Sequence, residues 1–563
     1  MKKIHCLAFF LFILFMAGFS IFLVCTPEKP AADLILKNGT FFTVDENNPH
    51  AQAVVIKNER ILFVGKDNQA LEYADIYTEI IDLKGKFGCP GFNDANIKLF
   101  TYAKFNNALD FSEVTTTLEI QKKVLKRIRE NNNYDDWVIA WGWDHTKLNL
   151  TDWPDRRILD RIAPFVPIIV FNDDGHIAFA NSKTLQIARI WASTSDPPGG
   201  KILKNQRTGN TTGILKERAM DFVLQYLPEI PDTTIIESIN EQLQKAVQFG
   251  ITTLQDKSSV EIIPFIKKLQ EQNHYNCRIS LAFPLKKDIS EYVTLKDNFQ
   301  NNNIYINPLT VAIDGSIKSR TAMLSAPYSD KPSTNGISQI SFEKLSDLII
   351  FADQNNLLIE LHASGDAAVQ KAIEAFELAY TVNKIKNRRF RLEGIEIINP
   401  AIIKSLKDLN LITVMNPSRC MDAVRWMNKT VGIGRTRFAY PFASIHKTGT
   451  KIAFGSGHPY GILNPLYGIY AAVTRKDTSG HPLHGWIPEE RLTIKEAIKA
   501  YTLGSAYAEL KEDEKGSLKA GKLADIVILD KNILQIPYKD ILDTQVIYTV
   551  KGGKVIYKHS NHQ

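Results

Sequence analysis

The chain has 563 residues, of which 44% are hydrophobic and 23% are charged, and its formal net charge at pH 7 is +7. These values are ordinary for a globular protein, and the length allows one large core and a small satellite domain. The five cysteines form no Cys-x-x-Cys pair, and no basic motif stands out. A disulfide framework, a zinc ribbon and a nucleic-acid module are therefore not indicated.

The N-terminal segment, residues 1–25, has the composition of a membrane or export signal. Lys2 and Lys3 precede an apolar run from Ile4 to Cys25 that contains no acidic or basic residue besides His5. A run of about 20 apolar residues can span a bilayer. We expect an uncleaved anchor, a cleaved signal peptide, or a lipoprotein modified at Cys25. In each case the rest of the chain is exported, as a membrane-anchored, secreted or periplasmic protein.

Both ends of the remaining chain predict short strands. Residues 33–87 alternate in the manner of strands, with Asn38-Gly39 as a turn signal between two of them. Residues 516–557 show the same strand-like alternation. Neither end has enough strands to form a stable sheet alone. We therefore expect the two ends to pair into one small composite β-sandwich.

Between these ends, residues 88–515 alternate apolar strand-like runs with amphipathic helical runs such as 235–249 and 367–379. Continuous apolar strands flanked by helices favour a parallel sheet that is buried on both faces. Repetition over this length predicts a (β/α)8 TIM barrel, whose reactive face lies at the carboxyl ends of the strands. The candidate strands are 137–141, 167–171, 252–256, 278–283, 309–314, 357–362, 412–416 and 451–456.

Several motifs occur in a fixed order along the chain. Gly88–Leu99 contains Pro90-Gly91 and Asp94, Asp174-Gly175-His176 follows, and Gly516-x-Leu-x-x-Gly-Lys-x-Ala-Asp ends at Asp525. Over residues 33–557 the sequence resembles the metal-dependent amidohydrolase superfamily, in particular amidohydrolase family 3 with its YtcJ-like and N-substituted formamide deformylase-like members. The resemblance implies a TIM barrel with a composite sandwich, and hydrolysis of non-peptide C–N bonds by metal-activated water.

The same resemblance implies six metal-ligand positions, and five of them carry residues that are poor zinc ligands. Glycine offers no side chain, asparagine and threonine bind zinc weakly, and an ammonium repels a cation. His362 is the only retained ligand. At the degenerate positions, Asn96 and Lys98 stand in place of the His-x-His pair and Thr310 in place of the carboxylated lysine. Gly394 stands in place of the second lone histidine, and Gly457 in place of the final aspartate.

Five residues, with His362 among them, are candidates for what is left of a pocket: Asp174, His176, Asp314, His362 and His458. They are either remnants of a substrate pocket or groups that satisfy buried backbone. His458 follows the lost aspartate by one residue, so a rebuilt site could combine it with His362 and with the lysine at position 98. That lysine either fills the space left by the metal, paired with Asp94 or Asp314, or extends toward solvent.

Two functional hypotheses follow. The first is a catalytically degenerate binding or structural protein, a pseudoenzyme that needs no cofactor and keeps a pocket for a small amide-like ligand. The second is an active hydrolase of an amide or N-substituted formamide, either metal-free or with a zinc-like divalent metal at a rebuilt site. Both hypotheses expect no nucleic-acid partner and a membrane contact through the N-terminal segment alone. The oligomeric state stays open.

Overall fold

We describe a computed structural model of the chain, which covers residues 29–131, 136–148, 150, 153–272, 276–301, 303–384 and 388–560. The predicted anchor or signal segment, residues 1–25, lies outside these described residues. Within them, every helix is too short or too polar to cross a membrane.

The predicted (β/α)8 barrel is confirmed. Eight parallel strands form one sheet, and the sheet closes where Ile97 pairs with His458, just beyond the last strand. The amide of Lys98 donates a 2.8 Å hydrogen bond to the carbonyl of His458 at this seam. In barrel order the strands are β8 (Phe92–Ile97), β15 (Ile251–Asp256), β16 (Arg278–Pro284), β17 (Ile304–Ala312), β18 (Ile359–Ala363), β19 (Arg391–Gly394), β20 (Ile412–Met415) and β21 (Lys451–Phe454).

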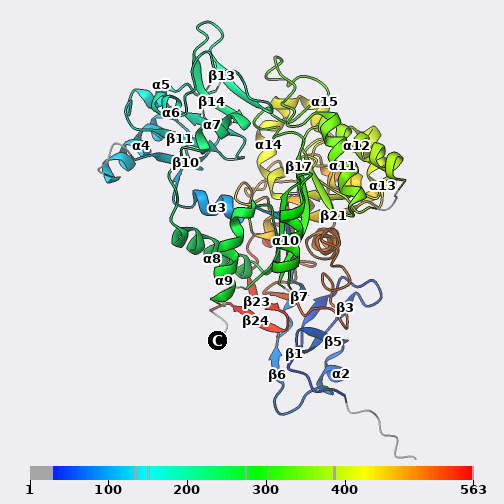
Figure 1. Ribbon diagram of the computed structural model, residues 1–563. Coiled ribbons are helices and arrows are strands. Elements are labelled where there is room, and N and C mark those ends of the chain that lie inside the picture. Colours follow the sequence, from blue (N-terminus) through cyan, green and yellow to red (C-terminus); the bar gives the residue numbers. More distant parts are fainter. Residues whose placement is uncertain are drawn as a thin grey trace, which may run out of the picture.

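Helices follow the barrel strands and pack around them (Figure 1). Local sequence explains where several begin: the side chain of Ser341 caps α11, and Thr493 with Glu496 forms a capping box at α18. The barrel helices are α8 (Asp232–Gln248), α9 (Ile263–Glu271), α10 (Ser290–Phe299), α11 (Phe342–Gln354), α12 (Asp366–Asn383), α13 (Ile403–Asp408), α14 (Ser418–Val431), α15 (Ile433–Thr436), α16 (Phe442–Lys447), α17 (Pro465–Thr474), α18 (Ile494–Lys499) and α19 (Ser505–Ala508).

A second sheet is inserted between the first and second barrel strands. It has six strands in the order β13-β14-β12-β11-β10-β9, and it lies beside the barrel in Figure 1. Two of the eight candidate strands, 137–141 and 167–171, belong to this sheet, whereas β19 was not among the candidates. A buried apolar run looks the same in either sheet. The strands are β9 (Leu109–Asp110), β10 (Val138–Trp143), β11 (Ile168–Asn172), β12 (Ile177–Ala180), β13 (Gly200–Lys204) and β14 (Thr211–Glu217), with helices α3 (Leu99–Phe105), α4 (Thr117–Asn131), α5 (Arg157–Asp160), α6 (Ser182–Ile187) and α7 (Asp221–Leu224).

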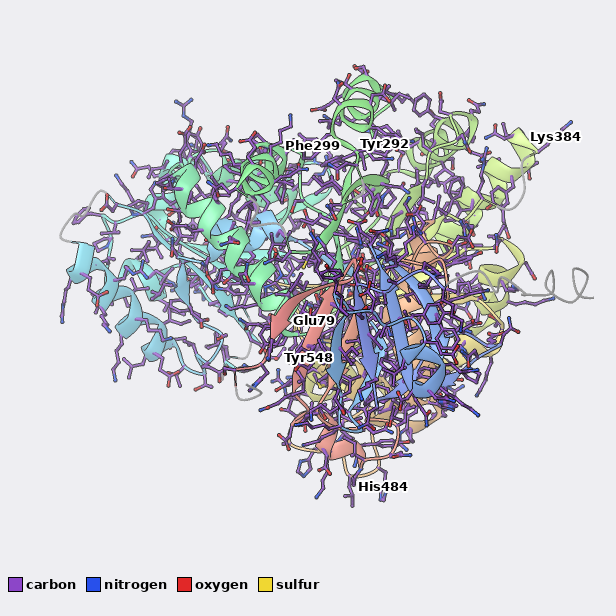
Figure 2. All side chains as sticks on the ribbon, turned by 90° about the horizontal axis from the view of Figure 1, so that it is seen from below. Glu79, Tyr292, Phe299, Lys384, His484 and Tyr548 are labelled. Carbon is purple, nitrogen blue, oxygen red and sulfur yellow. The ribbon has the colours of Figure 1, made fainter. Side chains whose placement is uncertain are left out.

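The predicted sandwich is also present, and both chain ends build it. Its two sheets share one apolar core, in which Leu36 and Val54 from the start of the chain pack with Ile526 and Ile547 from its end. Figure 2 shows Glu79 and Tyr548, from the two ends, in the same part of the molecule. The sheets are β5-β4-β1-β6 and β24-β23-β22-β7-β2-β3, with strands β1 (Leu34–Lys37), β2 (Thr40–Phe42), β3 (His50–Ala51), β4 (Ala53–Lys57), β5 (Arg60–Gly65), β6 (Glu79–Asp82), β7 (Phe87–Pro90), β22 (Ile526–Leu529), β23 (Val546–Lys551) and β24 (Lys554–Lys558), and helix α2 (Asp67–Leu71).

Candidate functional site

A small polar cavity of about 60 Å³ lies at the carboxyl ends of the barrel strands, where the inserted sheet meets them. The barrel contributes residues at the ends of β8, β18, β19 and β20, and the inserted sheet contributes the turn between β11 and β12. This is the end of a TIM barrel at which active sites are built. The cavity is lined by Asn96, Lys98, Asp174, His176, Ser316, His362, Ser364, Glu393, Gly394, Glu396, Asn416, Arg419, Tyr440, Gly457 and Tyr460.

His362 and Glu393 form a partly buried pair on neighbouring barrel strands. The Nδ1 atom of His362 donates to Oε2 of Glu393 at 2.5 Å, and its Nε2 atom lies 3.2 Å from the carbonyl of Gly315. Burial opposes protonation of His362, but the Glu393 carboxylate outweighs it and raises the imidazole pKa to about 9. At neutral pH this ring is therefore a cation.

His176 forms a second pair of the same kind, with Glu217 at the end of β14. The Nδ1 atom of His176 donates to Oε1 of Glu217 at 2.9 Å, and Gln339 donates to the other carboxylate oxygen at 2.7 Å. Burial lowers the pKa of His176, yet Glu217 raises it above its usual value overall. The rings of His176 and His362 lie nearly parallel, with centroids 6.3 Å apart. Two imidazoles, each beside a glutamate that raises its pKa, thus face each other across the cavity.

Asp174 lines the same cavity but its carboxylate is already engaged. Ser316 and Ser319 each donate to Oδ2 at 2.7 Å, and Asn172 donates to Oδ1 at 2.5 Å. Burial alone would raise the pKa of Asp174, but the His176 and Arg419 cations and these donors lower it. Asp174 therefore acts as a fixed negative charge that orients the turn carrying His176.

The other two pocket candidates do not line the cavity. The carboxylate of Asp314 accepts hydrogen bonds from the backbone amides of Met323, Ser364 and Gly365, so it holds loops together, and burial raises its pKa to about 6. The ring centroids of His458 and Tyr102 lie 5.2 Å apart, and burial lowers the pKa of His458 to about 4. The structure thus does not bring His458 together with His362.

Four of the five degenerate positions line the cavity, whereas Thr310 lies on β17 away from it. Asn96 donates to Oε1 of Glu393 at 2.8 Å. The ammonium of Lys98 lies 5.1 Å from the centre of the Tyr460 ring. Among the described residues it forms no ion pair, and in particular it pairs with neither Asp94 nor Asp314. Burial lowers its pKa. Lys98 therefore points into the cavity as an unpaired donor.

The donor set at the barrel mouth does not fit a zinc ion. Glu393, the one carboxylate beside His362, already accepts from His362, Asn96 and Asn416. Lys257 adds an ammonium 3.9 Å from Glu393 and 2.5 Å from Glu360. The site thus offers two histidines, His176 and His362, each bound to a carboxylate and with ring centroids 6.3 Å apart, among several cations, whereas zinc needs at least three converging ligands.

Sequence reasoning missed several residues of this site, most notably Lys257, Glu217 and Arg419. Lys257 directly follows the candidate strand 252–256. Residues at the carboxyl end of a barrel strand lie at the mouth of the barrel, so this position could have marked Lys257 as a site residue. Glu217 gave no such signal because its partner, His176, is 41 residues away. Arg419 donates to the carbonyl of Tyr460 and lies 3.6 Å from Glu396.

A closed parallel barrel with a composite sandwich and a polar mouth defines the amidohydrolase class of hydrolases. The chain belongs to this class: the model of the amidohydrolase family (Amidohydro_3) matches residues 79–557. Protein LONG AFTER FAR-RED 3 of Arabidopsis thaliana is 29% identical, over 94% of this chain and 92% of the plant protein. The putative amidohydrolase YtcJ of Bacillus subtilis (strain 168) is 27% identical, over 93% of this chain and 99% of its own.

Solved structures agree with this assignment. A metal-dependent hydrolase from Pyrococcus furiosus superposes with a TM-score of 0.68 at 26% identity, covering 89% of this chain and all of its own. The fold is thus shared with a protein that is described as a metal-dependent hydrolase.

Proposed function

We propose that this chain is a ligand-binding member of the amidohydrolase family that has lost metal-dependent hydrolysis. One observation carries the proposal: the carboxylates at the barrel mouth are balanced by the chain's own cations. Glu360 pairs with Lys257 at 2.5 Å and with Arg391 at 2.6 Å, and Glu393 pairs with His362. A divalent cation placed here would meet carboxylates that are already paired, apart from the buried Oε2 of Glu396, and would be repelled by these cations.

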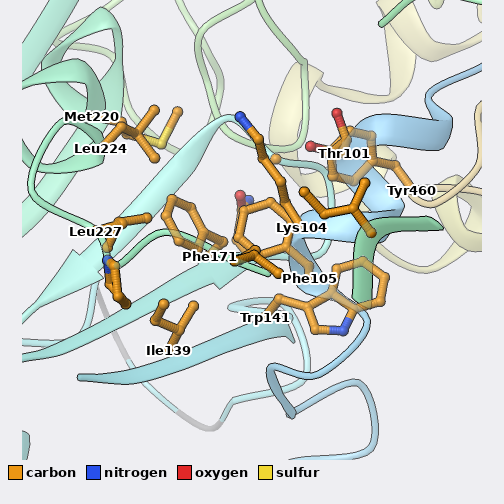
Figure 3. A pocket seen from close by; sticks show the side chains of 15 residues that line it. Thr101, Lys104, Phe105, Ile139, Trp141, Phe171, Met220, Leu224, Leu227 and Tyr460 are labelled. Carbon is orange, nitrogen blue, oxygen red and sulfur yellow. The ribbon is translucent and has the colours of Figure 1, made fainter. Parts of the chain in front are cut away.

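A second cavity supports binding of a small molecule. It has a volume of about 430 Å³, within the usual range for ligand pockets, and its lining is mainly apolar. Figure 3 shows Trp141 and Phe171 of the inserted sheet on one side of it, Met220 on another, and Tyr460 at its end. Tyr460 also lines the polar cavity, so the two spaces share a wall.

This pair of cavities suits a ligand with an apolar body and one amide-like head. The body would lie along Trp141 and Phe171, where burial of aromatic surface favours binding. The head would place its carbonyl oxygen near Lys98 and His176, whose protons have no acceptor on that side of the cavity among the described residues. Such a ligand needs no metal.

An active amide hydrolase is the second candidate, because two histidine–glutamate pairs face one cavity. Both His176 and His362 have raised pKa values, so each could donate a proton to a leaving amine. At neutral pH a protonated His362 is a poor general base. Burial lowers the pKa of Lys98, so Lys98 is one group that could take a proton from water, beside the carboxylates that line the cavity.

The experiment that tests the proposal measures the metal content of the full-length folded chain, purified without chelator and then incubated with zinc and dialysed. We expect far less than one metal ion per chain, and no hydrolysis of N-phenethylacetamide with or without zinc. One equivalent of zinc that is lost in His362→Ala would overturn the proposal. Hydrolysis without bound metal, abolished by Lys98→Met, would favour the second candidate.

Binding is tested separately, by calorimetric titration with the same amide. Trp141→Ala should weaken binding at least tenfold. The matched control is Trp191→Ala, because Trp191 is 53% exposed and lies outside both cavities. Equal affinity of the two variants for the amide, or no saturable binding to the unaltered chain, would remove the support for a ligand pocket.

A further inference from the structure

A third cavity, of about 830 Å³, lies away from the barrel mouth, between the β13–β14 hairpin and the loop that contains Arg320 and Ile337. Seven of its lining residues are lysine or arginine, and one is acidic, Asp155. Such an excess of one sign in a concave surface focuses the electrostatic potential and attracts the opposite charge. We refer to this cavity as the basic cleft.

Three of the seven cations are balanced by the chain's own carboxylates. Arg157 pairs with Asp155 at 2.7 Å and Lys201 pairs with Asp196 at 2.6 Å. Arg320 pairs with Asp330. These ion pairs fix side chains at the rim of the basic cleft. They do not neutralise the other cations that line it.

Three further cations have no carboxylate at ion-pair distance in the described part of the chain. Lys204 donates to the carbonyl of Thr194 and Lys216 to the carbonyl of Ser319, both at 2.7 Å. Arg207, at the tip of the hairpin, is exposed and makes no contact of this kind with the described residues. Neutral carbonyls leave these charges uncompensated, so the basic cleft keeps a surplus that an anion would neutralise.

Lys216 is the most informative of the three. It is only 6% exposed, and its ammonium lies 4.2 Å from the ring of Trp153 and close to the guanidinium of Arg320. Burial, followed by the charge of Arg320, lowers the pKa of Lys216 to about 7. Burying a cation beside another cation is costly unless an anion completes the site. The floor of the basic cleft is thus built for a negative group.

We propose that the basic cleft binds a small polyanion that carries at least two phosphate or sulfate groups. Arginine matches the geometry of tetrahedral oxyanions with its planar fork, and lysine adds point charges. The cleft has a volume of about 830 Å³ and Trp153 in its wall, which suits a compact molecule. This site shares no lining residue with the barrel-mouth cavity, and the proposal does not depend on the function proposed above.

The test is calorimetric titration of the full-length chain with sodium tripolyphosphate at low salt. We expect one saturable site per chain, with affinity that falls as sodium chloride is added, because ion pairing is screened. The double variant Lys204→Glu/Arg207→Glu should bind at least tenfold more weakly. A parallel titration with inositol hexasulfate separates the two classes of ligand, since the tighter one identifies the group that the cleft prefers.

The matched control is Lys554→Glu/Lys558→Glu, which makes the same change of net charge at the exposed strand β24, at the other end of the molecule (Figure 1). It should keep the affinity of the unaltered chain, and circular dichroism should show that both variants are folded. If both double variants lost the same affinity, the effect would come from the net charge of the chain and not from the cleft, which would overturn the proposal. Absence of saturable binding of both polyanions would overturn it as well.

Discussion

Lys257 and Glu360 form an ion pair of 2.5 Å inside the barrel, with Glu360 only 2% exposed. Lys257 follows β15 and Glu360 lies on β18, so the pair joins opposite parts of the barrel wall. Arg391 holds the other oxygen of Glu360 at 2.6 Å. In this chain, side-chain cations thus supply positive charge inside this end of the barrel.

Lys257→Met is expected to destabilise the chain by about 3 kcal/mol. The substitution leaves one oxygen of Glu360 buried without a partner, while Arg391 still holds the other, which keeps the cost near the low end for a broken buried pair. The measurement is the urea unfolding midpoint. Lys268→Met is the control, because its pair with Asp232 is exposed and should contribute less than about 1 kcal/mol.

The double variant Lys257→Met/Glu360→Gln distinguishes charge from packing. If the cost comes from the uncompensated carboxylate, the loss in the double variant should be smaller than the sum of the losses in Lys257→Met and Glu360→Gln. Additive losses would show that the two residues contribute independently, and would contradict the role of Lys257 as the counter-ion of Glu360.

Stability should depend on pH through His362. Its pKa is about 9 in the folded chain, against about 6.5 unfolded, because of Glu393. The stabilisation is therefore complete below about pH 6.5 and is lost as pH rises through 9. It amounts to at most about 3 kcal/mol, and to less because the side chain is 28% exposed. The thermal midpoint should fall over this interval.

His362→Gln should flatten that slope, since glutamine does not titrate. His446→Gln is the matched control: its imidazole lies 3.4 Å from Glu496 at an exposed position and should leave the slope unchanged. Identical slopes for the unaltered chain and His362→Gln would show that this pair does not govern the pH dependence.

The sequence predicts much of the fold, because order and periodicity are local signals. The turn at Asn38-Gly39, the motif that ends at Asp525 and the buried runs of the barrel each indicate their element directly. What it does not predict is the inserted sheet as a separate layer. Strand β11 (Ile168–Asn172) is as apolar and buried as a barrel strand, so composition cannot assign it.

The candidate site is predicted only in part, because local motifs mark some of its residues but not their partners. His176 and His362 were singled out because motifs mark them, and both line the cavity. Their partners Glu217 and Glu393 became meaningful only once folding had paired residues that are 41 and 31 positions apart. His458 lies beside a marked position, yet its ring turns toward Tyr102, which no local pattern indicates.

Gly175→Ala should damage the wall between the apolar and the polar cavity. An added Cβ at Gly175 would lie 2.3 Å from Cζ of Tyr460, which must then move. Gly209→Ala is the control: both glycines have positive φ, +79° and +71°, but nothing lies within 4 Å of a Cβ at 209. The control should lose about 1 kcal/mol from backbone strain alone.

Gly175→Ala should lose about 1–3 kcal/mol more than the control, from overpacking against Tyr460. Urea unfolding measures this difference, and titration with N-phenethylacetamide should show weaker binding for Gly175→Ala only. Equal stability and equal affinity in the two variants would mean that Tyr460 yields freely and does not shape the cavities.

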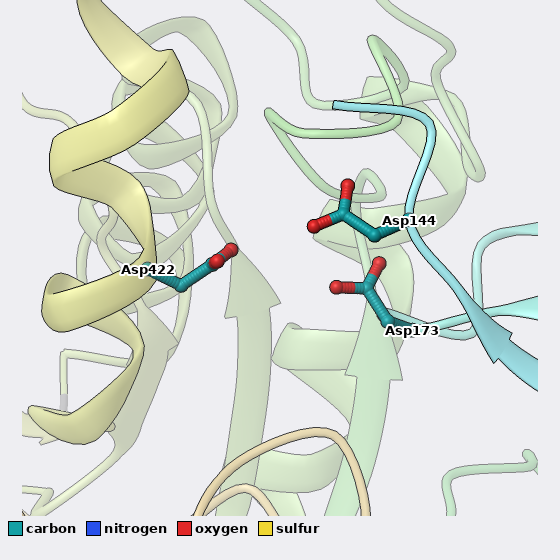
Figure 4. Close-up of side chains that lie close together, drawn as sticks. All are labelled: Asp144, Asp173 and Asp422. Carbon is teal, nitrogen blue, oxygen red and sulfur yellow. The ribbon is translucent and has the colours of Figure 1, made fainter. Parts of the chain in front are cut away.

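Removal of Lys318 should turn a cluster of acids into a cation site. Asp144, Asp173 and Asp422 point toward one another (Figure 4), and one carboxylate oxygen of each lies within 4.8 Å of the others. The ammonium of Lys318 lies between them, 2.9 Å from Asp144 and from Asp422 and in contact with Asp173. This lysine lies among the three carboxylates and offsets part of their negative charge, with Arg425 as a second cation at Asp144 and Asp422.

Lys318→Ala should therefore lower the thermal midpoint, and 10 mM calcium chloride should restore part of the loss, because Ca²⁺ prefers carboxylate oxygens. Arg425, which contacts Asp144 at 3.2 Å, stays in place and should keep the affinity in the millimolar range. The unaltered chain should show no shift with calcium, and Lys318→Ala/Asp173→Asn should lose the response. An equal calcium shift in the unaltered chain would mean that the ion acts elsewhere, and a folded Lys318→Ala without any shift would show that the three carboxylates separate once their lysine is gone.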